Sequence, residues 1–152
     1  MFEYKFTEQA KQQTTIDFTP KRNSVEDAGY DVKACLATDT VLLYPKQTLT
    51  IGTGICIHIA NNNYVGFLIP RSSTGKRGIM LKNTIGVIDS GYTAEIGMML
   101  TNTTEEDVLT ITNGDRLAQL VFLPIATPTL KLVNNFSFVS VRGENGFGSS
   151  GR

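Results

Sequence analysis

Apolar and polar residues alternate in short runs along most of the chain, and turn residues separate these runs. The clearest run is Ile55-Cys56-Ile57-His58-Ile59, in which an extended backbone places the three isoleucines on one face. The same pattern predicts strands over residues 2–6, 15–18, 30–36, 41–44, 48–51, 64–70, 95–101, 108–112, 116–123, 129–133 and 138–141. Only residues 77–82 have a pattern that favours a short helical turn.

The spacing of these runs predicts an all-β fold. Many short strands, with turns such as Thr19-Pro20 and Asn113-Gly114 between them, are typical of a jelly-roll-like sandwich or barrel. The composition agrees, because 19 Thr, 12 Ile and 10 Val are β-branched and favour strands. Residues 142–152 differ, since four Gly and two Ser beside one aromatic residue predict a flexible arm. We therefore expect one β domain over residues 1–141, followed by a C-terminal arm at 142–152.

Charge and cysteine content exclude several classes of protein. A net charge of zero, with 41% hydrophobic residues, argues against a disordered chain and against nucleic-acid binding through bulk positive charge. No apolar run approaches the roughly 18 residues of a membrane helix, and the first residues lack the apolar stretch of a signal peptide. Cys35 and Cys56 fit neither a disulfide scaffold nor a zinc site. We expect a cytoplasmic protein with no membrane partner.

Asp89 is the most suggestive acidic residue. It follows the apolar run 85–88 and precedes Ser90-Gly91. A carboxylate at a hairpin tip beside an apolar wall can be partly desolvated and act as a general base. The alternative is that Asp89 caps a β-turn, which is the usual role of an Asp-x-Gly sequence.

Two further segments contain groups suited to an anionic ligand. Residues 70–77 hold three cations and three hydroxyl side chains, which suit phosphate oxygens, although a solvated basic loop has the same composition. The amides of residues 143–151 can form an anion site with Phe147 as a lid, unless this segment is only a frayed end. His58, the single histidine, lies opposite the isoleucine row and is expected on the surface, which excludes classical triads and zinc sites.

Five segments, read in chain order, together resemble the five motifs of a known family. They are residues 28–32 (AGYDV), 70–73 (PRSS), 83–92 (NTIGVIDSGY), 114–120 (GDRLAQL) and 142–151 (RGENGFGSSG). The set is similar to the motifs of the homotrimeric dUTPases, the deoxyuridine triphosphate nucleotidohydrolases. The resemblance implies a jelly-roll homotrimer with sites at the subunit interfaces and with the arm supplied across an interface. It also implies Mg²⁺-dependent hydrolysis of dUTP to dUMP and pyrophosphate, which limits uracil in DNA and supplies dUMP for dTMP synthesis.

The resemblance implies roles for residues near the base and sugar. Asn83 and the hairpin at 85–92 would form the uracil and deoxyribose pocket, partly through main-chain groups. Tyr92 would pack on the sugar and leave no room for a 2′-hydroxyl. Asp89 would orient and deprotonate the water that attacks the α-phosphorus. The substrate-binding residues of this hairpin are then Asn83, Gly86, Val87, Ile88 and Tyr92.

The resemblance implies a second set of roles near the phosphates. The α- and β-phosphates would be held by Arg71, Ser72, Ser73 and Gln119. Asp31 would reach the magnesium ion through water. From the arm, Arg142 would meet phosphate and Phe147 would stack on uracil. The γ-phosphate would be enclosed by Gly148, Ser149 and Ser150.

Two other functions are compatible with parts of this pattern. The dCTP deaminases resemble dUTPases, but they work through a Glu-centred site, whereas the hairpin here carries Asp89 and Tyr92. A jelly-roll binding module that keeps nucleotide binding without turnover is the other alternative, and the presence of Asp89 argues against it. Release of ammonia from dCTP, or of pyrophosphate from dUTP, distinguishes the three.

Overall fold

The computed structural model describes residues 1–138, 140, 141 and 143, and within them the chain forms ten strands and two short helices. In chain order the elements are β1 (Glu3–Phe6), α1 (Glu8–Lys11), β2 (Tyr30–Lys33), β3 (Thr40–Leu43), β4 (Thr48–His58), β5 (Tyr64–Pro70), α2 (Ser72–Lys76), β6 (Ile79–Leu81), β7 (Gly86–Ile88), β8 (Glu95–Asn102), β9 (Leu109–Thr112) and β10 (Arg116–Pro124).

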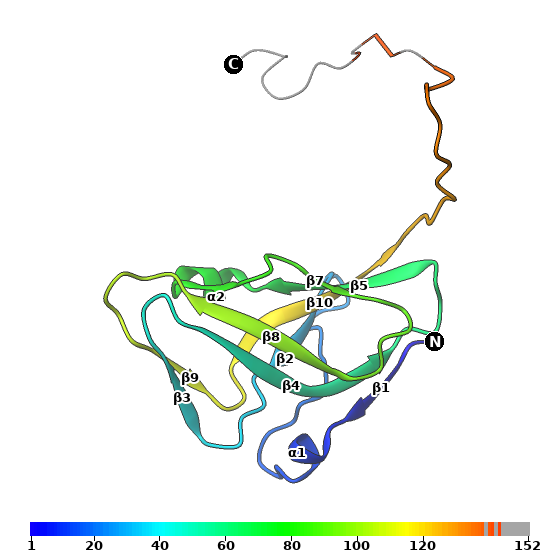
Figure 1. Cartoon of the computed structure of the whole chain (residues 1–152). Coiled ribbons are helices and arrows are strands. Elements are labelled where there is room, and N and C mark those ends of the chain that lie inside the picture. The colour runs from blue at the N-terminus through cyan, green and yellow to red at the C-terminus, as the bar shows by residue number, and fades with distance from the viewer. Residues whose placement is uncertain (139, 142, 144–152) are drawn as a thin grey trace.

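The strands form two four-stranded antiparallel sheets and one two-stranded sheet. The strand orders are β1-β4-β8-β6, β2-β10-β5-β7 and β3-β9. Figure 1 shows the two larger sheets stacked as layers, with the β3-β9 pair at one end. The predicted all-β fold is confirmed. Neither helix in the described part of the chain is long or apolar enough to cross a membrane.

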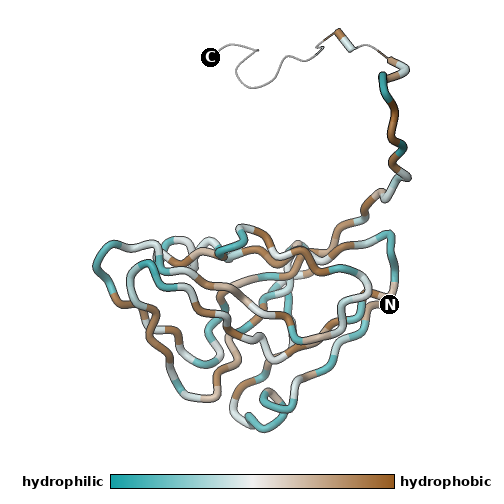
Figure 2. The backbone as a smooth tube through the Cα atoms, viewed as in Figure 1, coloured by the Kyte–Doolittle hydropathy of each residue, from teal (hydrophilic) through white to brown (hydrophobic). Residues whose placement is uncertain are grey.

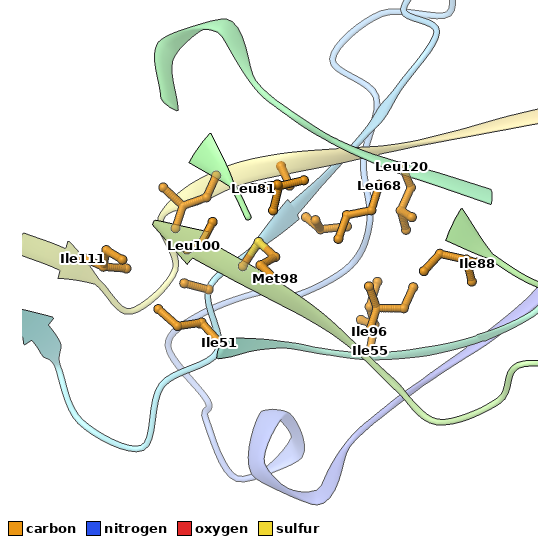
Figure 3. Close-up of a cluster of buried hydrophobic side chains, with 14 of the residues drawn as sticks. Ile51, Ile55, Leu68, Leu81, Ile88, Ile96, Met98, Leu100, Ile111 and Leu120 are labelled. Atoms are coloured by element: carbon orange, nitrogen blue, oxygen red, sulfur yellow. The ribbon is translucent and has the colours of Figure 1, made fainter. Parts of the chain in front are cut away.

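The core lies between the sheets and is built by the predicted alternation. Ile55, Ile57 and Ile59 are all buried, which confirms that they share one face. They pack against the inward residues of the opposite sheet, such as Leu68 and Leu120 (Figure 3). His58 lies on the other face of β4, where its side chain is 47% exposed, as predicted.

The long strand β4 contains a bulge. Gly52 lies opposite Gly97 and Cys56 lies opposite Glu95, so β4 has two more residues than β8 across this stretch. Gly54 within the bulge has a φ of +73°, and a Cβ there would lie 2.8 Å from the Ala10 Cβ. Glycine is therefore required at this position by both backbone conformation and close packing.

Four local predictions are wrong. Residues 77–82 are not helical, because the helical turn lies earlier, at α2, and β6 occupies the end of the range. Residues 15–18 are not a strand, since Ile16 and Phe18 pack with α1 from an irregular segment. Residues 129–133, and the described residues of 138–141, form no strand because no partner strand lies beside them within the described chain.

Beyond β10 the chain leaves the two sheets. Residues 125–138 contain no strand and are all exposed. Figure 1 shows this segment running away from the sheets, and Figure 2 shows that it carries several apolar residues. Among them Leu130 and Leu132 are more than 90% exposed. The boundary at residue 141 stays a prediction.

Candidate active site

Sheet pairing brings Asp31, Gln119 and Arg71 to one end of a single sheet. Asp31 of β2 lies opposite Gln119 of β10, and Gln119 lies opposite Ile69 of β5. Arg71 follows immediately after β5. Three segments that are far apart in the sequence therefore meet here, and we call Asp31, Arg71, Arg116 and Gln119 the phosphate-side cluster.

Asp31 is the centre of the phosphate-side cluster. Its side chain is only 10% exposed, and its carboxylate accepts from Arg71 Nε at 2.9 Å and from Arg116 Nη1 at 3.2 Å. A nearly buried carboxylate requires such partners, because an unpaired charge would be strongly unfavourable there. The ion pair in turn limits the positions that the Arg71 guanidinium can take. Asp31 thus orients the Arg71 guanidinium, whose Nη1 also donates to the Arg116 carbonyl at 3.3 Å.

The backbone after Arg71 is also anchored. The Arg71 amide donates to the Leu117 carbonyl at 3.2 Å, and the buried Thr74 hydroxyl donates to the same carbonyl at 2.7 Å. These bonds fix α2 against β10. Ser72 and Ser73, at the start of α2, are exposed and lie beside Arg71.

Arg116 is a residue of this cluster that the sequence reasoning left out of the site. It lies within the GDR part of residues 114–120, but no role was assigned to it. The sequence feature that could have indicated its role is a cationic residue at the start of the same predicted strand as Gln119. Only the antiparallel pairing of β2 with β10 shows that this cation reaches Asp31.

A second group of residues lies on β7 and in the turn that follows. Gly86 and Ile88 are buried and Val87 is 61% exposed, as expected for a strand with one face on the core. A Cβ at Gly86 would lie 3.0 Å from the Leu68 Cβ, so this close pairing with β5 favours glycine. We call Asp89 and Tyr92, which follow this strand, the base-side turn.

Asp89 does not lie at a hairpin tip, which corrects the prediction for residues 85–92. Strand β7 pairs with β5 in one sheet, whereas β8 pairs with β4 and β6 in the other, so the turn crosses between sheets. The Asp89 carbonyl accepts from the Tyr92 amide at 3.0 Å, which makes a β-turn through the main chain. Asp89 is exposed, and its carboxylate has no hydrogen-bond partner among the described residues.

Tyr92 and Asn83 lie on either side of β7 along the chain. The Tyr92 hydroxyl donates to the Glu95 carbonyl at 2.8 Å, while 40% of the residue remains exposed. Asn83 is exposed, and its carbonyl accepts from the Ile85 amide at 2.6 Å. An aromatic ring fixed at its hydroxyl and open on its face can contact a ligand.

The two groups of residues do not meet within one chain. Ile88 lies opposite Gly66 of β5, and Arg71 comes five residues further along the chain. At about 3.3 Å per residue, this separates the ends of the two groups by roughly 16 Å along the sheet. One apolar hollow lies elsewhere, beside β1, where Phe2, Tyr30 and Phe122 line it. Within the described chain, the two groups therefore occupy separate positions along β5.

The residues of the phosphate-side cluster are compatible with a magnesium ion held through water. Within the described residues, no group of three or more His, Cys, Asp or Glu side chains could hold a metal ion directly. Each Asp31 oxygen accepts from one arginine and retains a further lone pair, which can accept from water. Mg²⁺ commonly keeps several waters and takes its other ligands from substrate phosphates.

The remaining predicted site residues lie outside the described residues. These are Arg142, Phe147, Gly148, Ser149 and Ser150. Both cysteines are free, as predicted, and Cys35 is buried. Burial, together with the negative charge of Glu95, raises the pKa of the Cys35 thiol, so this group is an unreactive part of the core.

Comparison with known proteins gives consistent matches. A family model described as dUTPase matches residues 17–151. The deoxyuridine 5′-triphosphate nucleotidohydrolase of Baumannia cicadellinicola is 43% identical over 133 residues, which cover 88% of this chain and 87% of that protein. The enzyme of the same name from Legionella pneumophila is 43% identical over 126 residues, which cover 82% of this chain and 81% of that protein.

Solved structures are similar over the whole fold. A variant of the Staphylococcus bacteriophage 80alpha dUTPase with dUpNHpp has a TM-score of 0.83 and 31% identity, covering 100% of this chain and 99% of that chain. These matches favour a hydrolase of dUTP over a deaminase or a binding module without turnover.

Proposed function

This chain belongs to the dUTPase family and hydrolyses dUTP, and from that membership we propose how its own residues carry out the reaction. The observation that carries the proposal is the phosphate-side cluster. A nearly buried Asp31, which lies opposite Gln119 on the neighbouring strand, fixes the cation of Arg71, and Ser72 and Ser73 follow Arg71 in the chain. A chain with zero net charge must bind a polyanionic triphosphate through local cations of this kind.

We assign the α- and β-phosphates to Arg71, Ser72, Ser73 and Gln119. The guanidinium of Arg71 donates through Nε to Asp31 and through Nη1 to the Arg116 carbonyl, and its remaining N–H groups can donate to phosphate oxygens. The serine hydroxyls are exposed at the start of α2 and supply further donors. Mg²⁺, when bound through substrate oxygens and water near Asp31, would neutralise part of the phosphate charge.

Asn83, strand β7 and the base-side turn supply the groups for the nucleoside and for the water. Asn83 and the main chain of Gly86, Val87 and Ile88 take the uracil, and the exposed face of Tyr92 takes the deoxyribose. Asp89 accepts a proton from the water that attacks the α-phosphorus. Its exposed carboxylate, without a partner among the described residues, is available for that bond. The reaction then needs no covalent nucleophile.

We further propose that the chain forms a homotrimer in which each site combines residues of neighbouring subunits. The separation of roughly 16 Å along β5 supports this arrangement, because a neighbour related by rotation can place its base-side turn against the phosphate-side cluster. Ile85, just before β7, and Val87 within it are exposed apolar residues and are available for a subunit contact. The arm at 142–152 would close over such a site, and the cytoplasm is the compartment that fits two free thiols.

Turnover of dUTP beside dTTP, dCTP and UTP, with Mg²⁺ present, tests the proposed activity. We expect pyrophosphate release from dUTP at a rate far above that from the other three nucleotides. Ammonia release from dCTP would instead indicate a deaminase. Tight binding of dUTP without pyrophosphate release would indicate a binding module and would contradict the role of Asp89.

A further inference from the structure

The bulge in β4 lies directly beside the start of β8. At the bulge the regular ladder is interrupted, so the Gly54 amide has no main-chain partner in β8. It donates instead to Glu95 Oε1 at 2.8 Å. The Gly54 carbonyl accepts from the Thr7 amide at 2.9 Å, which ties the same residue to the start of α1. The Glu95 carboxylate thus replaces a missing rung of the sheet.

The packing around Gly52 leaves room for the Glu95 side chain. A Cβ at Gly52 would lie 2.3 Å from Glu95 Oε1 and 2.8 Å from its Cδ. The carboxylate therefore occupies the space that any larger residue at position 52 would need. This fit holds the Glu95 side chain across β4, next to the bulge.

Glu95 is also the anchor of Tyr92. Its main-chain carbonyl accepts from the Tyr92 hydroxyl at 2.8 Å. The side chain of Glu95 is therefore bonded to β4, and its main chain is bonded to Tyr92. Glu95 is the first residue of β8, and its pairing with Cys56 is separated by the bulge from the regular pairing that begins at Gly52 and Gly97. Without its side-chain bond, this end of β8 would be held by fewer contacts.

We propose that Glu95 is a positioning residue for Tyr92, and that it contributes in this way to the selection of deoxyribose over ribose. The inference rests on the proposed role of Tyr92 as the wall that excludes a 2′-hydroxyl. A wall discriminates by clash only if the ring cannot move aside. The path from the bulge through Glu95 to the Tyr92 hydroxyl restrains that movement. Glu95 itself need not touch the nucleotide.

The test is the ratio of kcat/KM for dUTP to kcat/KM for UTP in the full-length enzyme. In Glu95→Ala this ratio should fall about fivefold, the factor that corresponds to one net hydrogen bond. Glu95→Gln keeps an oxygen acceptor for the Gly54 amide and should keep most of the selectivity. Gly52→Ala should lower the ratio as Glu95→Ala does, because its Cβ displaces the carboxylate while position 95 is unchanged.

Thr53→Val is the matched structural control. The buried Thr53 hydroxyl donates to the Ile96 carbonyl at 2.7 Å, so its loss weakens the same bulge without touching Glu95. This variant should have a lower Tm and an unchanged dUTP/UTP ratio. If the dUTP/UTP ratio of kcat/KM falls together with Tm in every bulge variant, Thr53→Val included, the effect of Glu95 is only structural and the inference is overturned.

A double-mutant cycle tests the route through the hydroxyl. Tyr92→Phe removes the bond to Glu95 but keeps the ring, and it should lower the ratio about as much as Glu95→Ala. The double variant should then show no further loss. Additive losses would mean that Glu95 does not act through the Tyr92 hydroxyl.

Tyr92→Ala distinguishes failure of the proposed Glu95 role from failure of the proposed Tyr92 wall. If it abolishes the selectivity while Glu95→Ala leaves it intact, the positioning role is wrong and the proposed wall stands. If Tyr92→Ala leaves the ratio unchanged, Tyr92 is not the wall, and the inference about Glu95 fails with it.

Discussion

The phosphate-side cluster and the base-side turn are organised in opposite ways. Asp31 is 10% exposed and is paired with two arginines from other segments. Asp89 is exposed. Its main-chain carbonyl accepts a hydrogen bond from the Tyr92 amide, but its carboxylate has no hydrogen-bond partner among the described residues. The Asp31 carboxylate is thus paired within the chain, whereas the Asp89 carboxylate is exposed and unpaired within the described residues.

The difference fits the role that we propose for each group. Cations that hold a triphosphate gain from being fixed in advance, because no ordering cost remains when the ligand binds. A general base must keep a lone pair for water, so a permanent partner would compete with the reaction. In the proposed homotrimer, a neighbouring subunit would bring its Asp89 to the Asp31–Arg71 pair.

The largest effect is expected from a change in the base-side turn. Asp89→Asn keeps the size of the side chain and removes its basicity, so kcat should fall by about 10²-fold or more. Affinity for a non-hydrolysable dUTP analogue should stay close to that of the unmodified enzyme. Steady-state kinetics and a binding titration measure both. A loss of kcat below about tenfold would contradict the general-base role.

Mixed oligomers test whether the two groups come from different chains. Asp89→Ala and Arg71→Ala should each be nearly inactive, and co-refolding them should restore activity. In a cyclic oligomer with random mixing, about one quarter of the sites would combine an intact Asp89 with an intact Arg71. Activity that stays near zero in verified mixed oligomers, or a monomer by light scattering, would show that both groups act within one chain.

Removal of the chain after Val141 tests the contribution of the arm. Stacking of Phe147 on the base would be worth about 1–3 kcal/mol, so kcat/KM should fall about fivefold or more. The Tm should change little, because the strands end at Pro124 and residues 125–138 are exposed. Full kcat/KM in the shortened protein would mean that the arm takes no part in the site. A large drop in Tm would make it structural.

The smallest effect on turnover is expected from Asp31→Asn in the phosphate-side cluster. The change removes the charge between Arg71 and Arg116, so KM for dUTP should rise several-fold with a smaller change in kcat. The free energy of unfolding should fall by about 2 kcal/mol, since two arginines lose their common partner in a mostly buried position. Kinetics and denaturant unfolding measure these changes.

Asp17→Asn is the control for that variant. Asp17 is also paired with a cation, Lys21, but both side chains are at least half exposed. Exposed pairs contribute little, so neither KM nor Tm should change appreciably. If Asp31→Asn behaves like Asp17→Asn, the buried pairing does not organise the phosphate-side cluster.

Much of the fold was predictable because strand alternation is a local property. The predicted strands at 64–70 and 95–101 agree with β5 and β8 to within one residue. The isoleucine row of β4 is buried as predicted. The strand prediction failed where alternating apolar residues do not lie in a strand. At residues 15–18 an irregular segment packs its apolar side chains against α1.

The candidate residues were likewise predictable as a set but not as an arrangement. The five motifs identify the family, and Asp31, Arg71 and Gln119 do meet in the structure. The link of Arg116 to Asp31 was missed, and residues 85–92 were wrongly expected to form a hairpin. Both errors concern which strands lie side by side.

The sequence by itself determined the strand content, the inward faces of the strands, the family and the residues with the required chemistry. All of these depend on residue identity and on spacing over a few positions. Only the tertiary structure decided that β7 and β8 belong to different sheets, that Asp31 is shared by two arginines, and that Asp89 lies far from Arg71 along β5. Those features depend on pairing between distant segments, which hydrogen bonds and burial select across the whole molecule and which local periodicity does not encode.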